Sequence, residues 1–335
     1  LCKLFSLYKT KSNKYEALKP IVIGTFGEET GMQGTLKLIR KNKINARYAL
    51  VSEPSNLQII NATKGFLTVE IRIPFSKEES KIRKKLNSSE SVSTVSKVFS
   101  GKSAHSSTPH LGENAAFKMF DYIKDLPDQT LLLDIDAGGR YNLIPHQASV
   151  EIDQDVKIEH SATKKIKQVY SLIRKIEEDM KNFQDNDFSP SHSTVSIGIV
   201  RMYEDYILVG GSCRIVPSVN QDIYEKWVQI FEESCSDLGV EFHIQDFKKA
   251  FRTDTDSLLV KTVQSELAKK NLITSCRTVP STNEASLFTR VGVETVCMGV
   301  GEREGNAHTP TEKVKISQID EAIDLYAKII DRLCI

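Results

Sequence analysis

Residues 21–54 read IVIGTFGEETGMQGTLKLIRKNKINARYALVSEP, and their pattern carries most of the information on fold class. The apolar run at 21–26 predicts a buried strand that ends in a Gly-rich turn. Residues 34–41 predict a helix, and residues 49–52 predict a second buried strand. Strand, helix and strand at this spacing favour a parallel sheet flanked by helices.

Three acidic residues follow the two expected strands. Glu28 and Glu29 come directly after the first strand, and Glu53 follows the second. Functional residues of parallel sheets gather beyond the carboxyl ends of the strands. The sequence therefore predicts that these three carboxylates lie near one another.

The rest of the chain has two different characters. Between residues 63 and 248 we expect an α+β block, with strands at 66–73, 131–136, 148–153, 195–200, 206–209 and 240–244 and helices at 115–126, 162–183 and 224–238. After residue 250 the earlier style returns, with helices at 257–269, 284–289 and 316–333 and a buried strand at 293–298. The predicted fold class is α/β: a mostly parallel-sheet domain with flanking helices, residues 1–62 and 249–335, interrupted by an inserted α+β domain, residues 63–248.

Length and composition agree with a globular protein of two domains. The chain has 335 residues, whereas single cores stop growing near about 250–300 residues. A formal net charge of +1 gives no reason to expect a nucleic-acid or membrane partner. Six scattered cysteines favour a reducing compartment, so a cytoplasmic location is expected. The sequence shows neither a signal peptide nor an apolar run long enough for a membrane helix.

The adjacent acids Glu28 and Glu29 suggest hydrolytic metal chemistry. Neighbouring carboxylates repel each other unless a cation lies nearby, and on a turn one can bind a metal while the other reaches a water. A solvated acidic loop is the alternative. His308, in a Gly-rich loop after an expected strand, is either a ligand or a hydrogen-bonded loop residue. His105, among small residues, could stabilise an oxyanion or could be structural.

Taken together, these segments resemble the two-zinc metallopeptidase and deacylase family, which includes acetylornithine deacetylase, succinyl-diaminopimelate desuccinylase, aminoacylase and glutamate carboxypeptidase relatives. The resemblance covers nearly the whole chain. The matching pieces, in the family's order, are Gly27-Glu28-Glu29, Ser52-Glu53-Pro54, Ala104-His105-Ser106-Ser107 to Asn114-Ala115, Gly138-Gly139 to Asn142-Leu143-Ile144-Pro145, and Ala307-His308-Thr309-Pro310 to Glu312.

The resemblance implies a role for each of these residues. Glu28 would be the general base that deprotonates a water bridging two Zn²⁺ ions, with Co²⁺ or Mn²⁺ as possible replacements. Glu29, Glu53 and His308 would bind metal. His105 would stabilise the tetrahedral intermediate in the partner subunit of a homodimer formed through the inserted dimerisation and lid domain. The substrate, an N-acyl amino acid or small peptide, would be held by Asn142 and Arg214, and the turn Ser281-Thr282-Asn283 falls where the family lines its pocket.

The chain also departs from the family pattern. The family's first metal-binding His and its bridging Asp lie upstream of the Glu-Glu pair, yet none of the 27 residues before Glu28 is His or Asp. The substrate Arg is expected shortly after the Asn-x-x-Pro motif, whereas Arg214 comes much later. Two hypotheses follow: an amide-cleaving hydrolase shown here without its N-terminal part, or a non-catalytic relative acting in binding or assembly. On either hypothesis, we expect this chain to bind fewer than two zinc ions.

Overall fold

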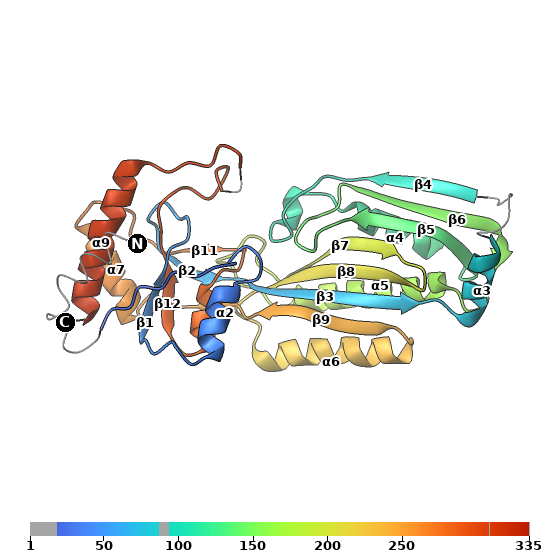
Figure 1. Cartoon of the computed structure of the whole chain (residues 1–335), viewed down its shortest axis with the longest axis horizontal. Helices are drawn as coiled ribbons and strands as arrows, with labels where there is room; N and C mark the ends of the chain where they lie inside the picture. The colour runs from blue at the N-terminus through green and yellow to red at the C-terminus, as the bar shows by residue number, and fades with distance from the viewer. Residues whose placement is uncertain (1–18, 87–93, 308, 335) are drawn as a thin grey trace. The chain divides into compact units, whose positions relative to one another are not determined.

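The computed structural model describes residues 19–86, 94–307 and 309–334. Two compact units make up the chain: Leu1–Lys64 together with Lys249–Ile335, called here the outer unit, and Gly65–Lys248, called the inserted unit. Figure 1 shows the strands and helices of each unit. In the described part of the chain, no helix is long and apolar enough to cross a lipid bilayer.

The outer unit is a mixed sheet with helices packed against it. Its described elements are α2 (Gln33–Arg40), β1 (Tyr48–Val51), β2 (Ile60–Thr63), β10 (Phe251–Arg252), α7 (Leu258–Ala268), β11 (Arg277–Val279), α8 (Ala285–Arg290), β12 (Glu294–Cys297) and α9 (Ile316–Cys334). The sheet order is β1-β12-β2-β10, with β11 beside β2. The pairs β1–β12 and β11–β2 are parallel, while β12–β2 and β10–β2 are antiparallel. The predicted α/β class is confirmed, with a sheet more mixed than expected.

The parallel pair β1–β12 brings two distant loops together. Val51 lies opposite Cys297 in the register, so the residues that follow both strands emerge at the same sheet edge. There the backbones touch: a Cβ on Gly299 would lie 2.5 Å from the carbonyl oxygen of Glu53. Only glycine allows this approach, which fixes the path of the chain around Glu53.

The expected strand at 21–26 is wrong. These residues form an extended, irregular segment without strand pairing. Ile21 and Phe26 are each 59% exposed, and the Phe26 carbonyl accepts a hydrogen bond from the Gly34 amide of α2 at 2.9 Å. An apolar run predicts burial, but a strand also needs a neighbour to complete its hydrogen bonds. The described segment finds that partner in the helix.

The inserted unit is an antiparallel sheet covered by helices. Its described elements are β3 (Gly65–Pro74), α3 (Lys77–Leu86), β4 (Thr94–Ser100), the 3₁₀ turn η2 (Pro109–Leu111), α4 (Ala115–Asp125), β5 (Thr130–Gly138), β6 (Gln147–Lys157), α5 (Ala162–Met180), β7 (Thr194–Met202), β8 (Tyr206–Ile215), α6 (Gln221–Asp237) and β9 (Glu241–Lys248). The sheet order is β4-β6-β5-β7-β8-β3-β9. Helix α5 contacts both α4 and α6, and their apolar faces share a core with the sheet.

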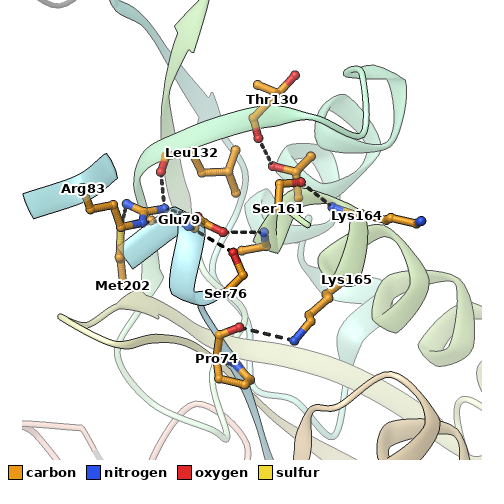
Figure 2. A network of polar contacts seen from close by, with 12 residues as sticks. Pro74, Ser76, Glu79, Arg83, Thr130, Leu132, Ser161, Lys164, Lys165 and Met202 are labelled. Atoms are coloured by element: carbon orange, nitrogen blue, oxygen red, sulfur yellow. Dashed lines mark hydrogen bonds and ion pairs between the residues drawn. The ribbon is translucent and has the colours of Figure 1, made fainter. Parts of the chain in front are cut away.

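A buried ion pair fastens α3 to the core of the inserted unit. The fully buried Glu79 carboxylate accepts from the Arg83 guanidinium at 2.7 Å and from the Ala162 amide at 2.8 Å. Figure 2 shows Glu79 beside Arg83 in this network. Arg83 also donates to the Leu132 carbonyl of β5. Because Ala162 begins α5, the carboxylate also meets the positive end of that helix. Glu79 therefore joins α3, β5 and α5.

Candidate functional site

Glu28 and Glu29 lie on a tight turn just before α2. Gly27 and Gly31 flank them with φ of 66° and 110°, values that favour glycine. The turn is closed by hydrogen bonds from the Met32 amide to the Gly27 carbonyl at 2.7 Å and from the Gly31 amide to the Glu28 carbonyl at 3.2 Å. Glu28 is half-buried and Glu29 is exposed. The glycines therefore give two adjacent carboxylates different surroundings.

Glu53 lies in a strongly acidic environment. Burial, the largest cause, and the carboxylates of Glu28, Glu284 and Glu29 together raise the pKa of Glu53 to about 7, while the charge of Arg303 opposes them. The Arg303 Nη1 lies 3.7 Å from Glu53 Oε2. The neighbouring carboxylates disfavour the ionisation of Glu53, because they carry the same charge. The structure therefore brings together the three acids chosen from sequence.

Sequence reasoning missed the fourth acid, Glu284. This buried carboxylate accepts hydrogen bonds from Thr35 Oγ1 at 2.6 Å and from Thr25 Oγ1 at 3.1 Å. Glu284 thus contacts the segment that carries Glu28 both before and after Glu28 in the chain. The only sequence signal was its place directly after the Ser281-Thr282-Asn283 turn. We call Glu28, Glu29, Glu53 and Glu284 the acid cluster.

The predicted ligand His308 lies outside the described residues. The residues around it belong to a loop tied together by Asn306. The Asn306 side chain donates to the Glu302 and Lys313 carbonyls, both at 3.0 Å, and accepts from the Lys313 amide at 3.0 Å. The Asn306 carbonyl also accepts from the Thr309 hydroxyl at 2.8 Å. Asn306 thus links Glu302, Thr309 and Lys313 to one another.

The acid cluster offers the donor chemistry of a divalent metal site. Carboxylate oxygens suit zinc, manganese and related ions, and a cation would relieve the repulsion felt by Glu53. The arrangement of side chains is less complete. Among the described residues, no three His, Cys, Asp or Glu side chains are placed so that they could hold a metal ion. The donor chemistry fits a metal, whereas the described side chains do not form a closed ligand set.

His105 belongs to the inserted unit, where it is exposed. Its Nδ1 accepts the Ser107 amide hydrogen at 3.2 Å and lies 2.7 Å from Ser107 Oγ. A ring nitrogen that accepts carries no hydrogen, so the neutral imidazole carries its hydrogen on Nε2. This contact fixes the orientation of the imidazole and makes Nε2 its hydrogen-bond donor.

The structure brings Asn142 and Arg214 close to His105. The Ser106 amide donates to the Asn142 carbonyl at 2.9 Å, and His105 pairs with Leu143 in an isolated bridge. The Arg214 Nη2 lies 3.5 Å from Ser106 Oγ. These contacts join the three residues predicted in the inserted unit, which we call the His105 cluster: His105, Asn142 and Arg214.

Arg214 is more enclosed than a surface substrate anchor would be. Its side chain, in β8, is only 5% exposed, and its guanidinium lies 4.1 Å from the ring centroid of Phe66. A guanidinium stacked in this way is held in one orientation and keeps its charge. Arg214 is far from the Asn-x-x-Pro motif along the chain, but Ser212 of the same strand donates to the Tyr141 carbonyl, directly before Asn142, at 2.8 Å.

The fold and the acid cluster define an α/β protein with an inserted sheet unit and a carboxylate-rich site beside its strand ends. Residues 8–332 match Peptidase family M20/M25/M40, and the chain belongs to this family.

Two relatives illustrate the extent of the similarity. The acetylornithine deacetylase of Myxococcus xanthus is 22% identical over 325 residues, covering 94% of this chain and 65% of that protein. The chain thus spans just under two thirds of that curated relative. The aminoacylhistidine dipeptidase of Vibrio alginolyticus has a similar structure, with a TM-score of 0.61 and 13% identity over 93% of this chain and 70% of that one. The structural likeness supports the fold.

Proposed function

We propose that the full-length protein is a metal-dependent hydrolase that cleaves the amide bond of an N-acyl amino acid or small peptide. The observation that carries this proposal is the convergence of Glu28, Glu29 and Glu53, because their mutual repulsion calls for a cation. Family membership supports it. The name of the Myxococcus relative, a deacetylase of an amino acid, supports the substrate class.

Glu29, Glu53 and His308 would hold the metal in this proposal. Bound Zn²⁺, two ions in a complete site, would polarise the substrate carbonyl and lower the pKa of water; Co²⁺ or Mn²⁺ suits the same donors. Glu28 takes a proton from the attacking water and delivers it to the leaving amine. The half-buried position of Glu28 suits a general base better than the exposed position of Glu29, which this proposal assigns to the metal.

The His105 cluster would bind and orient the substrate. The hydrogen on His105 Nε2 suits donation to the carbonyl oxygen as negative charge develops on it. Arg214 offers a permanent charge for the substrate carboxylate, and Asn142 offers an amide beside it. Both residues are linked to the His105 turn through Ser106.

We also propose that the inserted unit forms a homodimer, because His105 is expected to act in the site of the partner subunit. In its described sheet, β4 lies at one edge beside β6, and Val98 on this strand is 61% exposed. An edge strand offers unpaired backbone groups to a second copy. A cytoplasmic location is inferred from the described cysteines, Cys213, Cys235, Cys276, Cys297 and Cys334, which are all free.

The direct test is a panel of N-acyl amino acids and dipeptides given to the full-length protein with Zn²⁺ or Co²⁺. Turnover of one substrate class that is abolished by a chelator and restored by metal is the expected result. Metal binding without turnover of any member would instead favour the second candidate, a binding or assembly protein. That candidate is supported by the incomplete ligand set of the described residues.

A further inference from the structure

One cation stands out within the acid cluster of the outer unit. Arg303 follows β12 in the chain, after Gly299. Its charge lowers the pKa of Glu53, against the effect of burial and of the neighbouring carboxylates. The guanidinium is a permanent charge, because it does not lose its proton at any pH that a folded protein experiences.

The two ends of the Arg303 guanidinium are held differently. Nη2 donates a hydrogen bond of 2.6 Å to Oγ of Ser281, a residue that is only 8% exposed. Nη1 lies 3.7 Å from the Glu53 carboxylate, too far for a hydrogen bond but close enough for strong Coulomb attraction. Ser281 is therefore the fixed attachment of Arg303, and Glu53 is the partner that can be exchanged.

Glu53 is also the carboxylate that the proposed function gives to a metal ion. A divalent cation that approaches Glu53 meets a positive charge that cannot be neutralised. It also has to replace an ion pair in a partly enclosed place, since the side chains of Arg303 and Glu53 are 28% and 15% exposed. Charges in such places are screened less than charges in water.

We propose that Arg303 is an internal counter-ion of this site, which competes with a divalent metal for the Glu53 carboxylate and thereby sets the metal affinity. The inference rests on the proposed function, because it assumes that Glu53 is a metal ligand. It accounts for the geometry of the described residues, where Ser281 holds one end of the Arg303 guanidinium and the other end lies 3.7 Å from the Glu53 carboxylate. The affinity is then lower than that of the same carboxylates without the arginine.

The test is titration of the full-length protein with Co²⁺ alone. Binding is measured by calorimetry and by the visible spectrum of bound cobalt. In Arg303→Gln the competing charge is gone, so we expect Co²⁺ to bind roughly tenfold more tightly or better. Arg303→Lys keeps a positive charge and is expected to bind within about threefold of the original protein. If Arg303→Gln does not fold, as judged by circular dichroism, Arg303→Met removes the same charge and keeps the apolar stem.

Arg47→Gln is the matched control. Arg47 is exposed and precedes β1, whereas Glu53 follows that strand, so the same charge is lost at the opposite strand end. Equal tightening in Arg47→Gln, or unchanged or weaker binding in Arg303→Gln, would overturn the counter-ion while leaving the metal site intact. If neither the original protein nor any variant binds Co²⁺, the proposed function fails together with the inference.

Discussion

The two units hold their candidate side chains by opposite means. In the outer unit, the acid cluster gathers like charges, and burial together with the neighbouring carboxylates raises the pKa of Glu53 to about 7. In the inserted unit, hydrogen bonds hold the His105 cluster: the Ser107 amide donates to the imidazole, and the Ser106 amide donates to the Asn142 carbonyl. The acid cluster therefore keeps an excess of negative charge that Arg303 offsets only in part, whereas hydrogen bonds hold the His105 cluster together.

This difference indicates which residues contribute mainly to function and which contribute mainly to stability. Repulsion between neighbouring carboxylates destabilises the fold, and perturbed pKa values of this kind are typical of functional sites. The inserted unit instead places its buried charges in pairs, as Glu79 and Arg83 show. We therefore expect substitutions in the acid cluster to affect turnover more than stability, and substitutions in the inserted framework to do the reverse.

The largest expected effect is that of Glu28→Gln on turnover. Loss of the general base should lower kcat about 10³-fold, equivalent to about 4 kcal/mol. The melting temperature should stay the same or rise, because one repelling carboxylate is removed. Steady-state kinetics with metal analysis would measure this. Normal turnover at unchanged metal content would show that another residue is the base.

The second effect tests the framework of the inserted unit. Glu79→Ala leaves the Arg83 guanidinium and the Ala162 amide without their buried acceptor, so unfolding should cost about 3 kcal/mol less. Denaturant titration measures the change. The neighbouring Glu78→Ala, at an exposed position of the same helix, is the control and should change little. Equal losses in both variants would contradict the role given to the Glu79 network.

The third effect concerns His105. His105→Ala should lower kcat about 10²-fold with a smaller change in KM, because its donation matters most in the transition state. Ser107→Ala removes the hydroxyl beside Nδ1 but leaves the amide contact, so a milder loss is expected. A KM effect without a kcat effect in His105→Ala would assign His105 to substrate binding instead.

The smallest expected effect is that of Tyr141→Phe. Tyr141 precedes Asn142, and its hydroxyl donates to Glu70 of β3. Burial, together with this hydrogen bond, raises the pKa of Tyr141 to about 12, so the hydroxyl stays protonated at neutral pH. Removing it should lower the free energy of unfolding by about 1 kcal/mol. Tyr203→Phe, whose ring stacks on Tyr206, should change stability less in the same denaturant experiment.

The sequence allowed much of the fold to be predicted, because most elements have clear periodicity. Helices such as α5, with buried residues at helical spacing, agree with prediction. Strand β2 was missed because its four residues, INAT, are too short a run to give a clear period, although all four are buried. The Asn61 side chain is satisfied there by the Thr253 carbonyl at 3.0 Å, a contact that no local pattern reveals.

The candidate site could be predicted only where motifs mark it. Glu28, Glu29 and Glu53 stood out because they follow apolar segments, although the first segment is no strand. Glu284 and Arg303 did not stand out, since their importance comes from contacts with Thr35, Ser281 and Glu53 far away in sequence. Whether each predicted residue performs its assigned role stays a prediction.

The central claim is that the acid cluster of the outer unit binds the metal. The most direct test is elemental analysis of the full-length protein after dialysis, compared with the double variant Glu29→Gln/Glu53→Gln. Loss of two ligand charges should abolish tight binding of zinc, while circular dichroism stays unchanged. If the folded double variant retains as much zinc per chain as the original protein, the metal site lies elsewhere and the account is contradicted.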